Sequence, residues 1–267
     1  MPKTPHFNFK LPKTDIQTIS KFKVTIILFL AVIMGYLILS NLNPFIPVSQ
    51  IRFFSATISS PMNLLIYFLI HISYGHLLIN LFYILAFSSI VESRLNSKDS
   101  FLIFILSALI PAIIFLIQFP LSSLAGASAA AHGLLGAALM LDLKKSFFTL
   151  AIIFFVLFFS LLPLIDIQSK ELVNQENTKL NKLKTDFQKA VEEKDVEKQE
   201  LLKLVLEKQT KKAVSLGESY DNSVFTPANP LIHVYAILVG AFFVLFLRKK
   251  QSIFGKYNEK SIFSEPS

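Results

Sequence analysis

The sequence predicts an all-α polytopic membrane protein built as a bundle of six transmembrane helices. Of its 267 residues, 53% are hydrophobic, 27 are Phe and only 16% are charged. A soluble domain of this length could not bury so much apolar surface in one core. The apolar residues also gather in six segments that approach the roughly 20 residues needed to cross a bilayer as a helix. These segments are 24–42, 64–90, 101–119, 124–141, 147–165 and 231–247.

Proline and asparagine residues predict where several of these spans bend, end or begin. Pro111 is expected to kink the third span and Pro163 to end the fifth, because proline lacks an amide hydrogen and crowds the preceding turn. Asn229 and Pro230 form a favourable cap and first turn for the sixth span. The first span is not followed by a cleavage site of small residues, so we expect a retained helix and not a removed signal peptide.

The basic residues predict the orientation of the spans. Fourteen of the 15 Lys and Arg residues outside residues 166–222 fall on one side of a six-span topology, whereas Arg52 alone falls on the other. Because basic residues stay on the cytoplasmic side, both termini are predicted to be cytoplasmic. The net charge of +8 therefore reflects membrane topology, and no nucleic-acid partner is expected. The chain has no cysteine, which excludes disulfides, thiolate metal ligands and a cysteine nucleophile.

Residues 166–222 differ from the rest of the chain, since they carry 12 acidic and 11 basic residues. A 3-4 spacing of apolar residues predicts amphipathic, coiled-coil-like helix there. The stripe consists of Leu180, Leu183, Phe187, Ala190, Leu201 and Leu204. Both ends of this insert must return to neighbouring spans, which favours two antiparallel helices reversing near residues 192–198. A single solvated helix along the surface is the alternative.

The predicted organisation has five parts. They are a cytoplasmic N-terminal segment (1–23), spans one to five (24–165), a charged helical external insert (166–228), span six (229–247) and a basic cytoplasmic tail (248–267).

Polar side chains inside the spans are the functional candidates, because they are costly in lipid unless they face protein or water. They are His71, His76 and Asn80 in span two, Ser128 and His132 in span four, and His233 in span six. At 1.5 Å per residue, all of them fall in one layer near the outer surface. His76 and Asn80 share a helix face, whereas His71 can join them only if the chain around it is not helical.

Span four opens with a run of small residues, 126–138, that surrounds Ser128. Small residues let helices approach to backbone contact, so this span is predicted to be the central, protein-enclosed helix of the bundle. One interpretation is that Ser128 is a nucleophile in this enclosed position. The alternative is that the small residues serve packing only, and that the Ser128 hydroxyl bonds a carbonyl one turn earlier.

The residue types limit the chemistry of this layer. Glu92 and Asp142 lie at the cytoplasmic ends of spans, so a Ser-His-Asp triad inside the membrane is excluded. A serine activated by an imidazole is still available, and a histidine or asparagine side chain could donate to a developing oxyanion. Zinc bound by the histidines is the rival interpretation. The spacing His71-x4-His76 differs from the His-x3-His of metalloprotease helices and lacks their Glu, so no metal or other cofactor is expected.

These residues carry a resemblance to a known family. The chain has His71-x4-His76-x3-Asn80 in span two, Gly126-Ala127-Ser128 at the start of span four and His233 in span six, and it also has Glu92 in a turn after span two. In order, span number and membrane side, this pattern resembles the signature of the rhomboid intramembrane serine proteases. The resemblance covers roughly residues 45–165 and 225–247, and it implies a six-transmembrane rhomboid-like bundle in which the insert lies between spans five and six.

The resemblance implies a role for each candidate residue. Ser128 corresponds to the nucleophile and His233 to its general base, while Asn80, His76 and the Ser128 amide correspond to the oxyanion site. His71 and His132 correspond to supporting residues. The implied function is an intramembrane serine endopeptidase that cleaves transmembrane protein substrates near the outer membrane face, in lipid and without a cofactor. The expected location is the plasma (inner) membrane of a bacterium.

The chain also departs from the family pattern. Ala129 replaces a glycine after the serine, His132 replaces an aromatic residue that packs on the base, and Ala236 replaces a packing glycine although Gly240 is retained. His132 could stack on His233 or compete for Ser128. A Trp-Arg pair of the first external segment is absent, with Ile51-Arg52 nearest to it.

These departures and the charged insert favour two further hypotheses. The first is a catalytically inactive rhomboid-fold protein that binds membrane clients, and the second is a divalent-metal carrier or sensor. The insert itself is expected to recognise an external domain of a substrate or partner.

Overall fold

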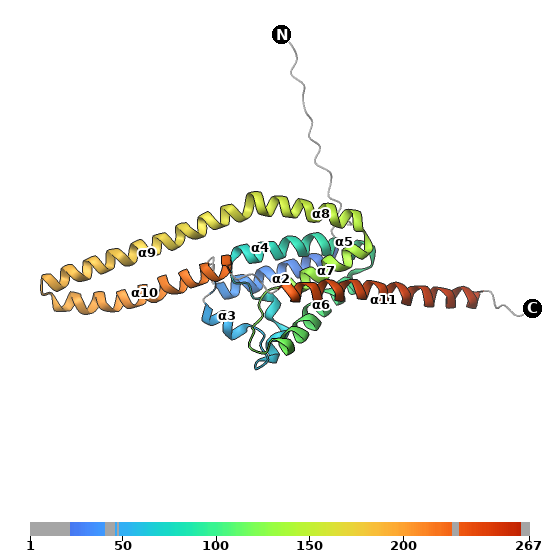
Figure 1. Cartoon of the computed structure of the whole chain (residues 1–267), viewed down its shortest axis with the longest axis horizontal. Helices are drawn as coiled ribbons and strands as arrows, with labels where there is room; N and C mark the ends of the chain where they lie inside the picture. Colours follow the sequence, from blue (N-terminus) through green and yellow to red (C-terminus); the bar gives the residue numbers. More distant parts are fainter. Residues whose placement is uncertain (1–21, 41–45, 47, 226–229, 263–267) are drawn as a thin grey trace, which may run out of the picture.

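The computed structural model describes residues 22–40, 46, 48–225 and 230–262, and it is helical throughout most of them (Figure 1). Extended pairing within these residues is confined to two isolated bridges, Ala56 with Leu124 and Thr57 with Ser60. Most of the helices pack as one bundle, and a long helical hairpin projects from one end of it (Figure 1). The predicted all-α class is therefore confirmed.

Five helical stretches of the described residues are long and apolar enough to cross a membrane, which supports a multi-pass membrane protein. They are α2 (Lys23–Ser40), α4 with α5 (Tyr74–Tyr83, Ser89–Arg94), α6 (Ser97–Gln118), α8 with α9 (Leu143–Val156, Leu162–Glu192) and α11 (Pro230–Ile262). The fourth predicted span is α7 (Ser128–Leu141), which has 14 residues. Its length of about 21 Å is less than the roughly 30 Å hydrocarbon thickness, so the count of six spans stays a prediction.

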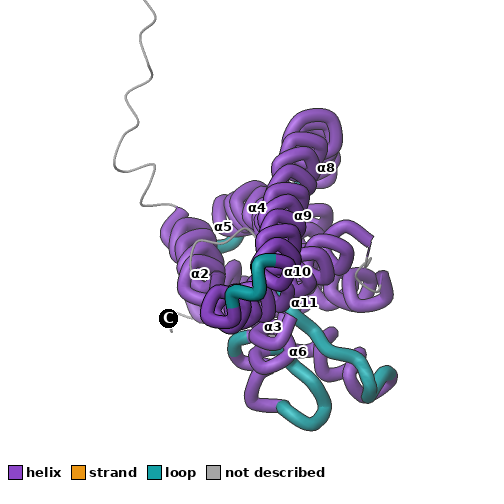
Figure 2. Tube along the Cα trace, turned by 90° about the vertical axis from the view of Figure 1, so that its left-hand side faces the viewer, coloured by secondary structure: helices purple, strands orange, loops and turns teal. Residues whose placement is uncertain are grey.

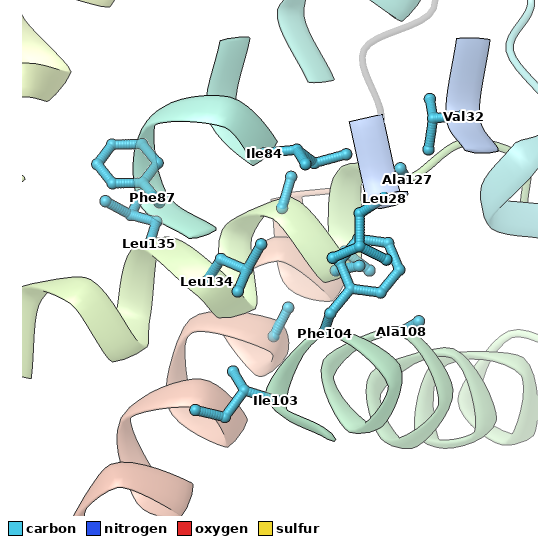
Figure 3. Close-up of a cluster of buried hydrophobic side chains, with 14 of the residues drawn as sticks. Leu28, Val32, Ile84, Phe87, Ile103, Phe104, Ala108, Ala127, Leu134 and Leu135 are labelled. Carbon is cyan, nitrogen blue, oxygen red and sulfur yellow. The ribbon is translucent and has the colours of Figure 1, made fainter. Parts of the chain in front are cut away.

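The short helix α7 packs against α6, α11 and the α4–α5 stretch (Figure 1). In the end-on view of Figure 2, the hairpin helices α9 and α10 point towards the viewer in front of the bundle. Nine of the 14 residues of α7 are buried. Leu134 and Leu135 of this helix pack in one cluster with Phe104 of α6 and Phe87 before α5 (Figure 3). A protein-enclosed central helix is what the run of small residues predicts.

Helices α7 and α11 cross at backbone contact. A β-carbon on Gly240 would overlap with the carbonyl oxygen of Gly133, and one on Gly136 would overlap with the carbonyl of Ile237. Glycine is therefore required on both helices for this close approach, as in small-residue crossings of other membrane helices.

The second predicted span begins later than hydropathy suggests. Residues Pro61–Leu65 and Tyr67–Leu69 form 3-10 turns, the chain is then extended, and α4 begins only at Tyr74. The Ser73 hydroxyl accepts from the His76 amide and caps α4. The Tyr67 hydroxyl donates to the Ala108 carbonyl of α6 and holds the preceding turn on the bundle. A continuous helix from Leu64 is therefore wrong.

Pro163 does not end the fifth span. Helix α8 passes through a π-helical turn, Leu157–Leu161, and continues directly into α9. Pro163 lies in the first turn of α9, where the amide hydrogen that proline lacks is not needed for a helical hydrogen bond. The wider π turn before it leaves room for the proline ring beside the preceding carbonyls. The predicted boundary at residues 165 and 166 is thus not a break in the helix.

The C-terminal end of span six also differs from the prediction. Helix α11 extends to Ile262, so the basic segment after residue 247 continues the helix. The predicted cap Asn229 lies outside the described residues, and α11 begins at Pro230 as expected.

The insert forms the favoured antiparallel hairpin. Helix α9 ends at Glu192, Lys194 adopts a left-handed φ of 55°, and α10 (Val196–Phe225) runs back. Leu180 and Ala190 of α9 are buried between the two helices, as the apolar stripe predicts. Leu201 and Leu204 were expected there as well, but they are 64% and 68% exposed. The turn interrupts the helical phase, so Leu202 and Leu206 of α10 face the seam instead.

A buried carboxylate holds the two hairpin helices in register. Glu176 of α9 accepts from Lys179 on its own helix and from Gln209 and Lys212 on α10. It lies beyond the apolar part of the α8–α9 stretch, where both helices are predominantly polar. The hydrogen bond from Lys179, followed by the bonds from Gln209 and Lys212, lowers the pKa of Glu176 from 4.5 to about 2.

We expect this carboxylate to make the hairpin sensitive to acid. A carboxyl group whose pKa is lower when folded stabilises the fold fully above its unfolded pKa, and the effect is lost as the pH falls from about 4.5 towards 2. Amide hydrogen exchange across α9 and α10, corrected for the intrinsic effect of pH, should therefore be faster at pH 3 than at pH 6. Glu176→Gln should remove most of this difference, whereas Glu171→Gln on the exposed face should preserve it. A pH response unchanged in Glu176→Gln would contradict the assignment.

Helix α5 lies towards the end of the bundle away from the hairpin (Figure 1), and its residue Glu92 ties three helices together. Its buried carboxylate accepts from the amides of Val24 and Thr25, from the Thr25 hydroxyl and from the Ser97 hydroxyl. These contacts join the starts of α2 and α6 to the end of α5. Asp142 caps α8 nearby and pairs with Arg94. Both acidic residues thus lie at helix ends and are separate from the layer that contains Ser128.

Candidate active site

Ser128 is the first residue of α7, and it is half-buried. Gly126, two residues earlier, has a φ of +105°, a left-handed conformation that glycine adopts without strain. Its amide donates to the Tyr67 carbonyl over 2.9 Å. This bond holds the loop before Ser128 on the 3-10 turn Tyr67–Leu69, which precedes α4. The helix was expected to begin at Leu124. It begins instead at Ser128, so no helical turn precedes the serine.

His71 joins the site through a backbone amide. It lies in the extended stretch before α4, which is the non-helical setting that its phase required. Its Nδ1–H donates to the Leu69 carbonyl over 3.3 Å, so Nε2 is the acceptor for the Ala127 amide, also over 3.3 Å. The fully buried ring therefore supports the loop that carries Ser128.

His76 and Asn80 lie one turn apart on α4, and the His76 ring meets this loop. The His76 ring stands beside Gly126, where a β-carbon would be 2.8 Å from its Nε2 atom, and its centroid is 5.0 Å from that of His71. Asn80 is 2% exposed, and its Nδ2 amide is buried with no hydrogen-bond partner in the described part of the chain. A buried amide donor without a partner is uncommon and costly, so it is a candidate for contact with a ligand.

His132 connects Ser128 to His233. The rings of His132 and His233 are stacked with centroids 4.1 Å apart and an angle of 15°. His132 Nδ1 lies 2.7 Å from the Ser128 carbonyl oxygen, and since a carbonyl can only accept, the imidazole donates this bond. The other neighbour of His132 is Tyr83, with ring centroids 5.2 Å apart. Of the two outcomes expected for His132, stacking is found, and its hydrogen bond goes to the carbonyl of Ser128.

His233 lies on the first turn of α11, and its Nε2 atom is buried with no hydrogen-bond partner within the described residues. No hydrogen bond between this nitrogen and the Ser128 hydroxyl is present there. The structure thus brings the serine and the imidazole into one cluster through His132 and leaves an unpaired basic nitrogen inside it.

The four histidines that the structure describes are not arranged as a ligand set for a metal. Within the described residues, no group of three or more His, Asp or Glu side chains is placed to hold a metal ion. The rings of His132 and His233 lie in nearly parallel planes, and the lone pair of an imidazole nitrogen lies in the plane of its ring. The nitrogen atoms of these two side chains therefore do not point at one common ion.

An apolar groove of about 560 Å³ lies between α4 and α8, beside this cluster. Its lining residues are Ile79, Tyr83, Phe147, Leu150, Ala151, Ile153, Phe154 and Leu157. Tyr83 belongs to both the groove and the cluster, since it also meets His132. The sequence analysis missed Tyr83, although its spacing of seven from His76 and three from Asn80 places it on their helix face.

Residues 59–171 match the family model of the Rhomboid domain. This part of the chain is therefore identified as a Rhomboid domain. No curated protein and no solved structure matches the chain. Rhomboid-family proteins are typically intramembrane serine proteases, and the family includes inactive members. The match contains α4 and α7, whereas α11 with His233 lies outside it.

Proposed function

We propose that this rhomboid-family protein is an intramembrane serine endopeptidase that cleaves transmembrane-anchored proteins. Ser128 is the nucleophile and His233 the general base in this proposal. The observation that carries it is the stacked pair of His132 and His233, because it brings an imidazole from α11 to the first turn of α7, where Ser128 lies.

The mechanism uses the unpaired groups of the site. His233 takes the proton of the Ser128 hydroxyl as its oxygen attacks the scissile carbonyl carbon. The resulting oxyanion accepts from the Asn80 amide, from His76 and from the backbone amide of Ser128 at the start of α7. Protonated His233 then gives its proton to the departing amine, and water hydrolyses the acyl-enzyme with His233 again as base. His71 and His132 position the serine loop and the base ring.

The substrate class follows from the groove between α4 and α8. Its lining is apolar and aromatic, which suits a transmembrane helix of a client in lipid. Tyr83 lines the groove and also contacts His132, so a helix seated in the groove lies beside the cluster that contains Ser128. The client must unwind locally for its peptide carbonyl to approach Ser128, which favours small or helix-breaking residues at the cut.

The topology in this proposal has six spans and cytoplasmic termini, with the α9–α10 hairpin outside the cell. Its support is the distribution of basic residues, with 14 of 15 outside the insert on the side of the termini. The position of Ser128 on the first residue of α7 supports a reaction near the outer face, where water can enter.

A second candidate function is an inactive rhomboid-fold protein that binds the same clients. Two observations favour it. The Ser128 hydroxyl makes no hydrogen bond to His233 within the described residues, and Ala129 stands where the family pattern has glycine.

Labelling by a serine-reactive fluorophosphonate probe distinguishes the two functions. Wild-type protein in detergent is expected to be labelled, and labelling should disappear in Ser128→Ala because Ser128 is the proposed nucleophile. Ser123→Ala, a serine in the loop before α7, is the matched control and should label as wild type. Wild-type protein that resists the probe while folded would favour the inactive client-binding protein.

A further inference from the structure

The outward face of α10 carries an apolar patch near the tip of the hairpin. Leu201 is 64% exposed, Leu204 68% and Val205 40%. Their spacing of three and four residues places them side by side on one helix face, and we name these three residues the α10 tip patch. Outward positions of α9 near the same level, such as Lys182, Thr185 and Lys189, are polar. Val191, Val196 and Val214 are also exposed on the hairpin, but none of them lies three or four residues from another exposed apolar residue. The patch is therefore a local cluster of apolar side chains on a mainly polar rod.

Charges of opposite sign lie at the two ends of the α10 tip patch. Glu197 and Glu200 are exposed on its tip side, and Lys208 and Lys211 are exposed on its base side. Lys211 also pairs with Glu207 at the surface. The complementary surface is a helical protein segment with two neighbouring apolar residues, a basic residue towards the tip and an acidic residue towards the bundle.

The distance of the patch from the apolar spans argues against the protein's own membrane as its occupant. Twenty residues separate Val205 from Phe225 at the end of α10, which corresponds to about 30 Å of helix. Figure 1 shows that the hairpin projects from one end of the bundle. A protein segment outside the bilayer is the occupant that can reach it.

The groove and the hairpin share one continuous helical stretch. Helix α8 supplies Phe147, Leu150 and Phe154 to the groove, and it continues through the π turn into α9. A client helix that lies against α8 therefore emerges from the membrane beside the hairpin.

We propose that the α10 tip patch binds the extramembrane segment of the client, about 20 helical residues beyond the client's membrane helix. This inference rests on the proposed function for the identity of the groove occupant. It adds a second recognition site at a distance from the site of cleavage. This site selects clients whose extramembrane segment has two apolar residues between a basic and an acidic residue. Two weak sites on one client give a higher combined affinity than either site alone.

A designed reporter client tests this binding without cleavage. It has one transmembrane helix followed by a 20-residue Ala- and Glu-Lys-based helix and then a segment with two leucines between an arginine and a glutamate. The full-length Ser128→Ala protein is combined with it in nanodiscs, with a donor dye on the reporter segment. The chain has no native cysteine, so Gln188→Cys on the exposed face of α9 gives a single acceptor site.

Energy transfer between the dyes should report binding that weakens roughly tenfold in the double variant Leu201→Ser with Leu204→Ser. Val214→Ser is the matched control, because Val214 is 53% exposed on the same helix outside the patch. It should bind as the parent protein does. A reporter with serines in place of its two leucines should bind as weakly as the double variant does.

Equal affinity of the double variant and Val214→Ser for the reporter would overturn the proposal. Light scattering that shows a dimer of the unliganded protein, lost in the double variant, would also overturn it, because the patch would then bind a second copy. Fluorophosphonate labelling of the double variant with Ser128 intact should equal that of wild type. Failure of wild-type labelling would overturn the proposed protease and leave the binding result standing, so the two failures are distinguishable.

Discussion

Gly240→Ala is expected to abolish labelling of Ser128 and to lower the thermal midpoint of the protein. The new methyl group would overlap with the carbonyl oxygen of Gly133, and backbone atoms cannot turn aside as a flexible side chain can. Overpacking of this kind costs about 1–3 kcal/mol of folding free energy. Helix α11 must move away from α7, and His233, two turns before Gly240, moves with it. Since a misplacement of about 1 Å can reduce a rate about a hundredfold, the loss of reactivity should exceed the loss of stability.

The measurement combines thermal unfolding in detergent with labelling by the fluorophosphonate probe. Gly217→Ala is a matched control, because the same substitution in α10 meets nothing within 4 Å. Alanine favours helix over glycine by up to about 1 kcal/mol, so this variant should be as stable as wild type or slightly more stable, with full labelling. A Gly240→Ala protein that matches wild type in both measurements would show that α7 and α11 are not in backbone contact.

The class of fold could be predicted because hydropathy over long segments reflects the solvent around them. The helix boundaries were less predictable, because tertiary contacts set them. Leu124 to Leu141 reads as one apolar segment, yet α7 begins at Ser128, where Gly126 turns the chain and bonds to Tyr67. Pro163 reads as a helix end, yet the π turn before it lets the helix continue. Leu201 and Leu204 read as seam residues because the 3-4 spacing was continued across a turn that resets the helical phase.

The candidate site could be predicted in part from the cost of placing polar groups in lipid. That cost singles out six side chains from spans two, four and six, and the structure places them around one loop. Their pairing could not be derived, because the stacking of His132 on His233 depends on where α7 and α11 cross. Tyr83 was missed because an aromatic residue in a span has an ordinary packing role, and only its contact with His132 links it to the site.

Substitutions at the two stacked histidines are expected to separate the base from the residue that positions it. His233→Ala should reduce cleavage of a transmembrane reporter by about a thousandfold or more, because it removes the group that accepts the Ser128 proton. His132→Phe should retain most activity, since a phenyl ring can still pack between Tyr83 and His233 although it cannot donate to the Ser128 carbonyl. His132→Ala removes both contacts and should cost about tenfold in kcat, with a smaller change in KM.

The comparison of His132→Phe with His132→Ala is the informative one, because both remove the second imidazole and only one preserves an aromatic face. Recovery of activity in the phenylalanine variant assigns His132 a positioning role through stacking. Equal and nearly complete loss in His132→Phe and His233→Ala would instead show that His132 takes part in proton transfer. Circular dichroism and the thermal midpoint of each variant control for folding, and Tyr235→Phe is the matched control on α11. Tyr235 bonds Gln118 at the exposed end of α6, so its variant should keep full activity and show that a lost hydrogen bond on this helix does not by itself disable the site.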